Sequence, residues 1–394
     1  MRPKSPILGR ISGSSRAAGP VGAGVKGRRW VLKGLGASMM AAPWVMRSSQ
    51  AQARQLHIMF SSDYLPDAFR KAFERETGLT VIHTPYGSND ELLSRLTATR
   101  GRQFDLVGPT NHITGLWKEV DLLQPLDVQR LPTAKLIPQM LASCEGFAWD
   151  GRMRLMPYLS GTEGVAWRTD RVAKEFNART YGEIGLGDIW HPSVLGGVMG
   201  RPYSLMAGIG RLLASEGKLP PFEDSYRDLE SMHAIWSKIA DFAIAHKPWI
   251  RQFWDRAEAQ ADGFSRNGVV IGQTWDGPVL RLIRDGAPLR FMVPKEGAFS
   301  WVDGMAIPIG AKNLDGAYAF MQFAMRPDMN ALLANRTCYR PVVKGADVHL
   351  DKAYRRVLAE AYPEPSRENL WQWPPMPAWY ERARGPYVDR FITA

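Results

Sequence analysis

Short apolar runs alternate with amphipathic stretches through the N-terminal half of the chain. Residues 56–60 and 79–83 are mostly apolar and predict two strands. Between these runs, apolar side chains recur at the spacing of one helix face: Leu65, Ala68, Phe69, Ala72 and Phe73. Gly78 stands where a left-handed helix C-cap is expected. A second helical stretch, with Asn89 as its expected cap, precedes a third strand at 104–108.

The alternation of strand and helix predicts an α/β fold with a parallel sheet. In such sheets, ligands lie beyond the carboxyl ends of the strands, in the loops that follow. We therefore expect the loops at 61–66, 86–89 and 109–114 to face a binding site.

A later stretch, 299–328, combines a short strand, a turn and a helix. Trp301 and Asp303 are two positions apart on the strand, so their side chains share a face. An aromatic ring beside a carboxylate can hold a cation, although a core tryptophan beside a solvated aspartate has the same spacing. Asn313 and Asp315 supply helix-cap residues, and Pro327 is expected to stop the helix.

This stretch resembles a segment of the periplasmic spermidine/putrescine-binding proteins of ABC transporters. The similarity covers roughly residues 56–372. The residues that carry it are Pro294-Lys295-Glu296-Gly297, Trp301, Asp303, Ala306-Ile307-Pro308, Ala311-Lys312-Asn313, Gly316-Ala317, Phe320, Phe323 and Arg326-Pro327-Asp328.

The resemblance implies an α/β, two-lobed periplasmic binding protein fold of type II, with a ligand cleft between the lobes. The chain crosses between the lobes more than once in this fold. We expect residues 54–158 and 303–345 to form the first lobe, and residues 159–302 and 346–394 to form the second.

The resemblance also implies a set of ligand-binding positions in this cleft. In the family, aromatic rings lie along a polyamine and carboxylates face its ammonium groups. The expected ligand-binding residues are Ser62, Tyr64, Thr110, His112, Arg201, Trp275, Asp276, Trp301, Asp303, Tyr339 and Gln372.

The chain departs from the family pattern where a carboxylate pair is expected. The family's Asp-x-x-Glu pair, which holds polyamine nitrogens, aligns with Arg201 and Ser204. An arginine would repel an ammonium, unless Asp63, Glu163 or Asp276 compensates. We expect a polyamine such as spermidine or putrescine as ligand. The alternatives are a zwitterion, such as an amino carboxylate or aminophosphonate bound by Arg201, and, from another class, an exported enzyme.

The charge of the chain is concentrated in its N-terminal leader. The whole sequence has a net charge of +11, but residues 1–53 hold nine Lys or Arg and no Asp or Glu. The remainder has 41 basic against 39 acidic residues. This balance argues against nucleic-acid binding and against a nonspecific cationic surface.

The leader has the build of an export signal. Arg28-Arg29 precede an apolar run that is too short to span a bilayer, and Ala51-Gln52-Ala53 offers a cleavage site. We expect a twin-arginine signal peptide over residues 1–53, cleavage after Ala53 and a location in the periplasm. The expected partners are the export machinery and an inner-membrane ABC permease, with the protein itself a monomer.

Catalytic and metal-binding motifs are not recognisable in the sequence. The seven histidines are scattered, and no pair has the spacing of metal ligands. We therefore expect no enzyme activity, no metal and no cofactor. Cys144 and Cys338 are the two cysteines. We expect two buried free thiols, with a disulfide as the alternative.

The leader generates the first prediction. Replacing both Arg28 and Arg29 by Lys should hold the precursor in the cytoplasm, because the twin-arginine pair is what the export machinery reads. Immunoblots of periplasmic and cytoplasmic fractions measure this. An unchanged periplasmic yield would mean that the leader belongs to another pathway.

Overall fold

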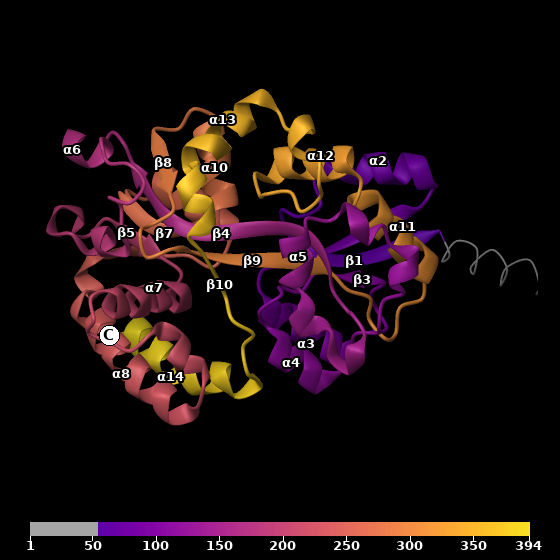
Figure 1. Cartoon of the computed structure of the whole chain (residues 1–394), viewed down its shortest axis with the longest axis horizontal. Coiled ribbons are helices and arrows are strands. Elements are labelled where there is room, and N and C mark those ends of the chain that lie inside the picture. Colours follow the sequence, from indigo (N-terminus) through magenta and orange to yellow (C-terminus); the bar gives the residue numbers. More distant parts are fainter. Residues whose placement is uncertain (1–53) are drawn as a thin grey trace, which may run out of the picture. The chain divides into compact units, whose positions relative to one another are not determined.

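Residues 54–394 are described by the computed structural model, and their strands form two sheets (Figure 1). The strands are β1 (Gln55–Ser61), β2 (Thr80–Tyr86), β3 (Leu106–Val107), β4 (Met156–Arg168), β5 (Val198–Gly200), β6 (Ile250–Phe253), β7 (Ile271–Trp275), β8 (Leu289–Met292), β9 (Ala298–Met305) and β10 (Leu370–Gln372). The predicted twin-arginine motif and cleavage site, within 1–53, lie outside the described residues.

The α-helices lie between these strands, singly or in succession, and short 3-10 turns fill several connections. The α-helices are α2 (Asp67–Thr77), α3 (Asn89–Thr99), α4 (Thr114–Val120), α5 (Pro138–Ala142), α6 (Lys174–Asn177), α7 (Pro202–Ser215), α8 (Leu229–Ala245), α9 (Ala257–Ser265), α10 (Asp276–Arg284), α11 (Leu314–Ala324), α12 (Pro327–Thr337), α13 (Lys352–Ala361) and α14 (Ala378–Thr393).

The first sheet is parallel, with the strand order β2-β1-β3. This confirms the predicted alternation of strand and helix. Gly78 ends α2 with a φ of 71°, and its N–H donates to the Glu74 carbonyl, as predicted. The predicted cap of α3 was wrong by one residue. The Ser88 side chain, not that of Asn89, accepts from the backbone N–H of Glu91.

The second sheet has the order β10-β9-β4-β7-β5-β6, and β8 pairs with the end of β4 on the edge opposite β7, beyond the part that pairs with β9. Its two long antiparallel strands, β4 and β9, extend toward the first sheet (Figure 1). There the backbone of β9 and its continuation bridges to β3 and to the loop after it, through Val107↔Ala306 and Thr110↔Asp303. The two sheets are therefore linked by a continuous ribbon.

We call the β2-β1-β3 sheet with helices α2, α3, α4, α11 and α12 the first lobe. The second sheet with helices α7 to α10, α13 and α14 is the second lobe. The residue boundaries predicted for the lobes stay a prediction, because residues 54–394 form one compact unit by their contacts.

Aromatic side chains fill the core of the first lobe. Phe69 and Phe73 of α2 meet Phe320 and Phe323 of α11 edge to face, with ring centroids 5.2–5.7 Å apart. All four rings are nearly inaccessible to water. Burial of these rings packs α2 firmly against α11. The loop after β1 therefore leads into a rigidly held helix.

Most of the structure predicted for residues 299–328 is confirmed. The Asn313 side chain caps α11 by accepting from the Gly316 N–H at 2.9 Å. Trp301 and Asp303 share a face of β9, and the indole Nε1 donates to the carboxylate at 3.0 Å. Pro327 follows the end of α11 and is the first residue of α12, a helix that was not predicted.

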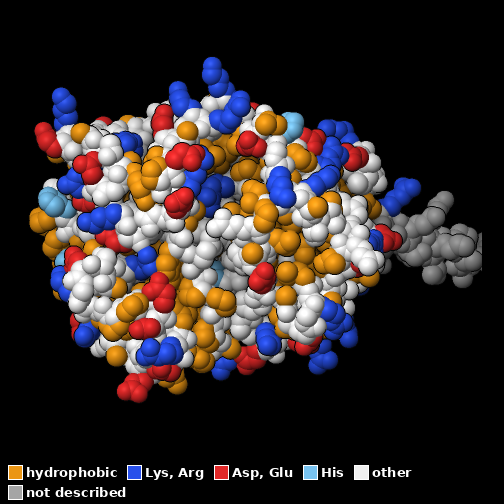
Figure 2. Space-filling view, viewed as in Figure 1, with side chains coloured by type: hydrophobic (Ala, Val, Ile, Leu, Met, Phe, Trp, Pro, Cys, Tyr) orange, Lys and Arg blue, Asp and Glu red, His pale blue; other side chains and the backbone are white. Residues whose placement is uncertain are grey.

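Both thiols are free and buried, which confirms the expectation for Cys144 and Cys338. Within 54–394, no helix has the length and apolarity needed to cross a membrane. Basic and acidic side chains are interspersed over the face shown in Figure 2, in keeping with the near-neutral balance of the chain outside its leader.

Candidate functional site

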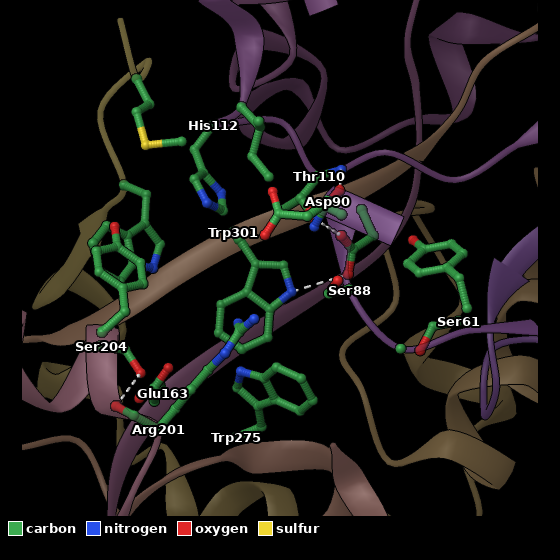
Figure 3. Close-up of a pocket in the computed structure, with 18 of the residues that line it drawn as sticks. Ser61, Ser88, Asp90, Thr110, His112, Glu163, Arg201, Ser204, Trp275 and Trp301 are labelled. Atoms are coloured by element: carbon green, nitrogen blue, oxygen red, sulfur yellow. Dashed lines mark hydrogen bonds between the residues drawn. The ribbon is translucent and has the colours of Figure 1, made fainter. Parts of the chain in front are cut away.

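A cavity of about 110 Å³ lies between the lobes, close to the point where β4 and β9 pass from one to the other (Figure 3). Its wall is made by both lobes and by the C-terminal segment. The lining side chains that carry charge are Asp90, Glu163, Arg201, Asp303, Glu381 and Arg384.

The three loops predicted to face a ligand all contribute to this wall. Tyr64 follows β1, Ser88 and Asn89 follow β2, and Thr110 follows β3. In the second lobe, Arg201 follows β5 and Trp275 ends β7. The carboxyl ends of strands in both lobes therefore point at one space, as expected for an open α/β sheet.

Eight of the eleven predicted ligand-binding residues line the cavity. They are Tyr64, Thr110, His112, Arg201, Trp275, Trp301, Asp303 and Tyr339. That they bind a ligand stays a prediction.

The other three predicted residues lie outside the lining. Ser62 is exposed, and its neighbour Ser61 lines the cavity instead. Gln372 donates to the Ser300 hydroxyl at 3.1 Å, and since successive side chains on a strand point to opposite faces, the following Trp373 faces the cavity.

Asp276 is fully buried but turned away from the cavity. Its carboxylate accepts the Tyr362 hydroxyl at 2.5 Å and the Gly277 N–H at 2.9 Å. Burial raises the pKa of Asp276 to about 6. A buried carboxylate takes the donors nearest to it, and for Asp276 these lie inside the second lobe, so it cannot compensate for Arg201.

The Asp303 carboxylate accepts three hydrogen bonds from the protein. Thr110 Oγ1 donates to Oδ1 at 2.5 Å, while the Tyr64 hydroxyl and the Trp301 indole donate to Oδ2. Burial raises the pKa of Asp303 to about 6, and these three donors oppose that rise. A carboxylate has about four acceptor positions, so one is left for a ligand.

Glycines make room for the rings that line the cavity. A Cβ on Gly161 would lie 2.5 Å from Cζ2 of Trp301, and one on Gly277 would lie 2.7 Å from the ring of Tyr339. Gly161 pairs directly with Trp301 across β4 and β9. Both rings therefore lie against backbone without a side chain: Trp301 against β4, and Tyr339 against the first turn of α10.

Arg201 extends into the cavity from the N-cap position of α7. Its guanidinium carbon lies 5.7 Å from the centroid of the Trp275 ring, and Figure 3 shows the side chain directed between Trp275 and Trp301. Among the described residues, Arg201 forms no ion pair, and its guanidinium donates no hydrogen bond. Arg201 is thus a free cation at a face where an ammonium was expected.

The second arginine of the cavity is paired. Arg384 Nη2 lies 2.7 Å from Oε1 of Glu381, and its guanidinium carbon lies 3.4 Å from the centroid of the Tyr203 ring. His112 stacks on Trp373, with ring centroids 5.7 Å apart. Burial first, then the charges of Arg201 and Arg384, lower the pKa of His112 to about 3. The imidazole is therefore neutral at physiological pH.

Glu163 of β4 is buried in the cavity wall opposite the first lobe. Gln273 Nε2 donates to its Oε1 at 2.8 Å. Burial raises the pKa of Glu163 to about 7, although the hydrogen bonds from Ser204 and Gln273 and the charge of Arg201 oppose the rise. Glu163 is thus only partly ionised at neutral pH.

The sequence reasoning missed the contribution of the C-terminal segment to the wall. Trp373, Met376, Glu381 and Arg384 line the cavity, and the Met376 backbone N–H donates to the His112 carbonyl at 2.8 Å. The available signal was the composition of residues 373–377, in which prolines favour an extended strap. Within 54–394, no cluster of three or more His, Cys, Asp or Glu could hold a metal.

Comparisons with known proteins agree with this geometry. A sequence model of the bacterial extracellular solute-binding proteins matches residues 68–355. The chain is 28% identical to the putrescine-binding periplasmic protein PotF of Escherichia coli (strain K12), over 81% of this chain and 85% of PotF. It is 29% identical to the spermidine/putrescine-binding periplasmic protein 1 of Haemophilus influenzae, over 67% of this chain and 68% of the relative.

A solved structure shares the fold. The putative spermidine/putrescine ABC transporter from Listeria monocytogenes superposes with a TM-score of 0.71 at 22% identity, over 86% of this chain and 99% of that one. This likeness confirms the predicted α/β fold of the two-lobed periplasmic binding proteins. The names of the curated relatives confirm the predicted location in the periplasm.

The contact between Gly161 and Trp301 generates a prediction about stability. Gly161→Ala should lower the free energy of unfolding by about 1–3 kcal/mol, because the added methyl group overpacks the indole. Denaturant titration measures this change. Gly385→Ala is the matched control: Gly385 lies within α14 with no atom near its Cβ position, so stability should stay the same or rise slightly. Equal stability of the two variants would contradict the proposed packing.

Proposed function

The chain belongs to the bacterial extracellular solute-binding proteins, and on this premise we propose that it captures a polyamine or a related small amine between its lobes for an ABC importer. The observation that carries the proposal is the buried Asp303 carboxylate, which faces the cavity beside the rings of Trp301 and Tyr64. The polyamine class comes from the names of the relatives.

Membership of this family excludes the enzyme alternative, because its members bind solutes and deliver them. The predicted recognition of the family is therefore confirmed, and so is the prediction that the chain is not an enzyme.

The surroundings of Asp303 suit an ammonium group. Asp303 is only 6% exposed, so a bound ammonium would meet its carboxylate with little water between the two. Charge-assisted hydrogen bonds of this kind are stronger than neutral ones. The rings of Tyr64, Trp301 and Tyr339 supply aromatic surfaces for the adjacent methylene groups and for cation–π contact.

The linkage of the lobes supports capture by closure. β4 and β9 connect the two lobes, and the cavity is lined from both sides. A solute held by both lobes would favour their closed arrangement, because only that arrangement offers both sets of contacts.

The partners follow from the same premise. We propose that the closed protein docks on an inner-membrane ABC permease, that it acts as a monomer, and that its leader directs export by the twin-arginine machinery. The near-neutral charge beyond residue 53 favours a cleft-bound solute over nonspecific binding by a cationic protein surface.

Asp303 generates the test of this function. Asp303→Asn should weaken the binding of putrescine, spermidine or another amine ligand by more than about tenfold, because the charge-assisted bond to the ammonium is lost. Isothermal titration calorimetry measures the dissociation constants. Asp276→Asn is the matched control, since Asp276 is equally buried but lies outside the cavity wall. Equal losses in both variants, or no loss in either, would sink the proposed ammonium site.

The raised pKa of Asp303 predicts that the affinity for an amine depends on pH. The free protein holds this carboxyl with a pKa of about 6, raised by burial. Its ionised form binds an ammonium and its protonated form does not, so affinity should be full above about pH 7. Affinity should fall by about tenfold between pH 7.5 and pH 5 as protonation proceeds. In Asp303→Asn the residual affinity should depend less on pH. An affinity that rises on acidification would contradict the assignment.

A further inference from the structure

Arg201 gives the cavity a cation that no carboxylate among residues 54–394 contacts directly. Its guanidinium lies over Trp275 at 5.7 Å and forms no ion pair within 54–394. An arginine stays protonated under all physiological conditions. A partly enclosed guanidinium without a contacting counter-ion is unfavourable. We therefore expect a ligand to place an anionic group beside Arg201.

The carboxylates around Arg201 are engaged elsewhere or exposed. Glu381 pairs with Arg384 at 2.7 Å. Glu163 accepts from Gln273 at 2.8 Å, and Asp90 is exposed at the start of α3. None of these three lies within 4 Å of the Arg201 guanidinium. The N–H donors of Arg201 are therefore available to a ligand, although its charge also acts at longer range on Glu163 and Glu381, where it opposes the rise in pKa that burial causes.

Asp303 supplies the opposite charge at the first-lobe end of the cavity. It is held by Tyr64 and Thr110 of that lobe, whereas Arg201 belongs to the start of α7 in the second lobe. The cavity thus presents one available anion and one available cation from different sides. We infer that the solute is a zwitterion, with its ammonium at Asp303 and Trp301 and an acidic group at Arg201; this rests on the proposed function, that the cavity binds an amine.

A second ammonium at the Arg201 end is disfavoured on two grounds. The guanidinium already occupies one face of Trp275, so that face is not free for another cation. Two like charges within a few ångströms repel strongly where water is scarce. A linear diamine would therefore have one end at Asp303 and the other near a fixed positive charge.

The acidic group is one that accepts two parallel hydrogen bonds. A guanidinium donates in this way to a carboxylate and equally to a phosphonate. The cavity volume of about 110 Å³ favours a short molecule, since a cavity of about 150 Å³ suffices for benzene. An amino acid or aminophosphonate with a few carbons between its two charges meets both conditions.

Matched ligands test the inference on the wild-type chain. Butylamine carries the ammonium alone, butyrate carries the acid alone, putrescine carries two ammonium groups, and 4-aminobutyrate and 2-aminoethylphosphonate carry both charges. Calorimetry should give at least roughly 30-fold tighter binding for one zwitterion than for putrescine or butylamine, as expected for a desolvated charge pair. The better of the two zwitterions identifies the acid.

The outcomes separate the inference from the function on which it rests. Putrescine binding more tightly than both zwitterions would overturn the inference and uphold the amine site. Butyrate binding as tightly as 4-aminobutyrate would overturn the proposed function. Failure of every ligand to bind would overturn both.

Charge reversal at Arg201 tests the same point within the protein. Arg201→Asp should abolish zwitterion binding and create binding of putrescine, because both ends of the cavity would then be anionic. Aspartate is a favoured N-cap, so α7 should persist, and thermal unfolding checks this. Arg256→Asp is the matched control, since Arg256 is also an N-cap arginine but is exposed outside the cavity. Zwitterion affinity that survives Arg201→Asp would overturn the inference.

Discussion

A carboxylate removed from water is the constraint on which the cavity depends. Asp303 can stay ionised only because Tyr64, Thr110 and Trp301 donate to it. Two of these donors come from loops of the first lobe, and the third comes from β9 itself. Asn89 in turn donates to the Thr110 hydroxyl at 2.8 Å. The loops after β1, β2 and β3 are thus held around one charge, and the ammonium site exists only when the first lobe is folded.

The rings depend on the backbone beneath them. Trp301 lies against Gly161 of β4, and Tyr339 lies against Gly277 at the start of α10. A side chain at either glycine would collide with a ring, so the close approach of backbone and ring requires glycine there. β4 also pairs with β7, β8 and β9. The positions of these strands in the sheet therefore determine where Trp301 lies in the aromatic wall. This explains how a cavity between lobes keeps a defined shape.

Sequence patterns predicted those parts of the site whose structure depends on residues close together in the chain. The helical stripe before Gly78, the loops that follow parallel strands and the shared face of Trp301 and Asp303 all depend on neighbours in sequence. Arg384 and Glu381 could not be found in this way, because α14 reaches the cavity only after the chain has returned along the second lobe. Asp276 shows the converse: it was expected to bind the ligand, but Tyr362, a donor distant in sequence, turns its carboxylate inward.

The division of charge between the lobes bears on how binding and closure are coupled. Arg201 is attached to the second lobe, while two of the three partners of Asp303, Tyr64 and Thr110, are in the first. A solute with a single ammonium would interact with Asp303 in much the same way whether the lobes are apart or together. A ligand shifts an equilibrium only by its difference in affinity for the two states. A solute that carries both charges satisfies Arg201 and Asp303 together only in the closed arrangement, so binding such a solute would favour closure of the lobes.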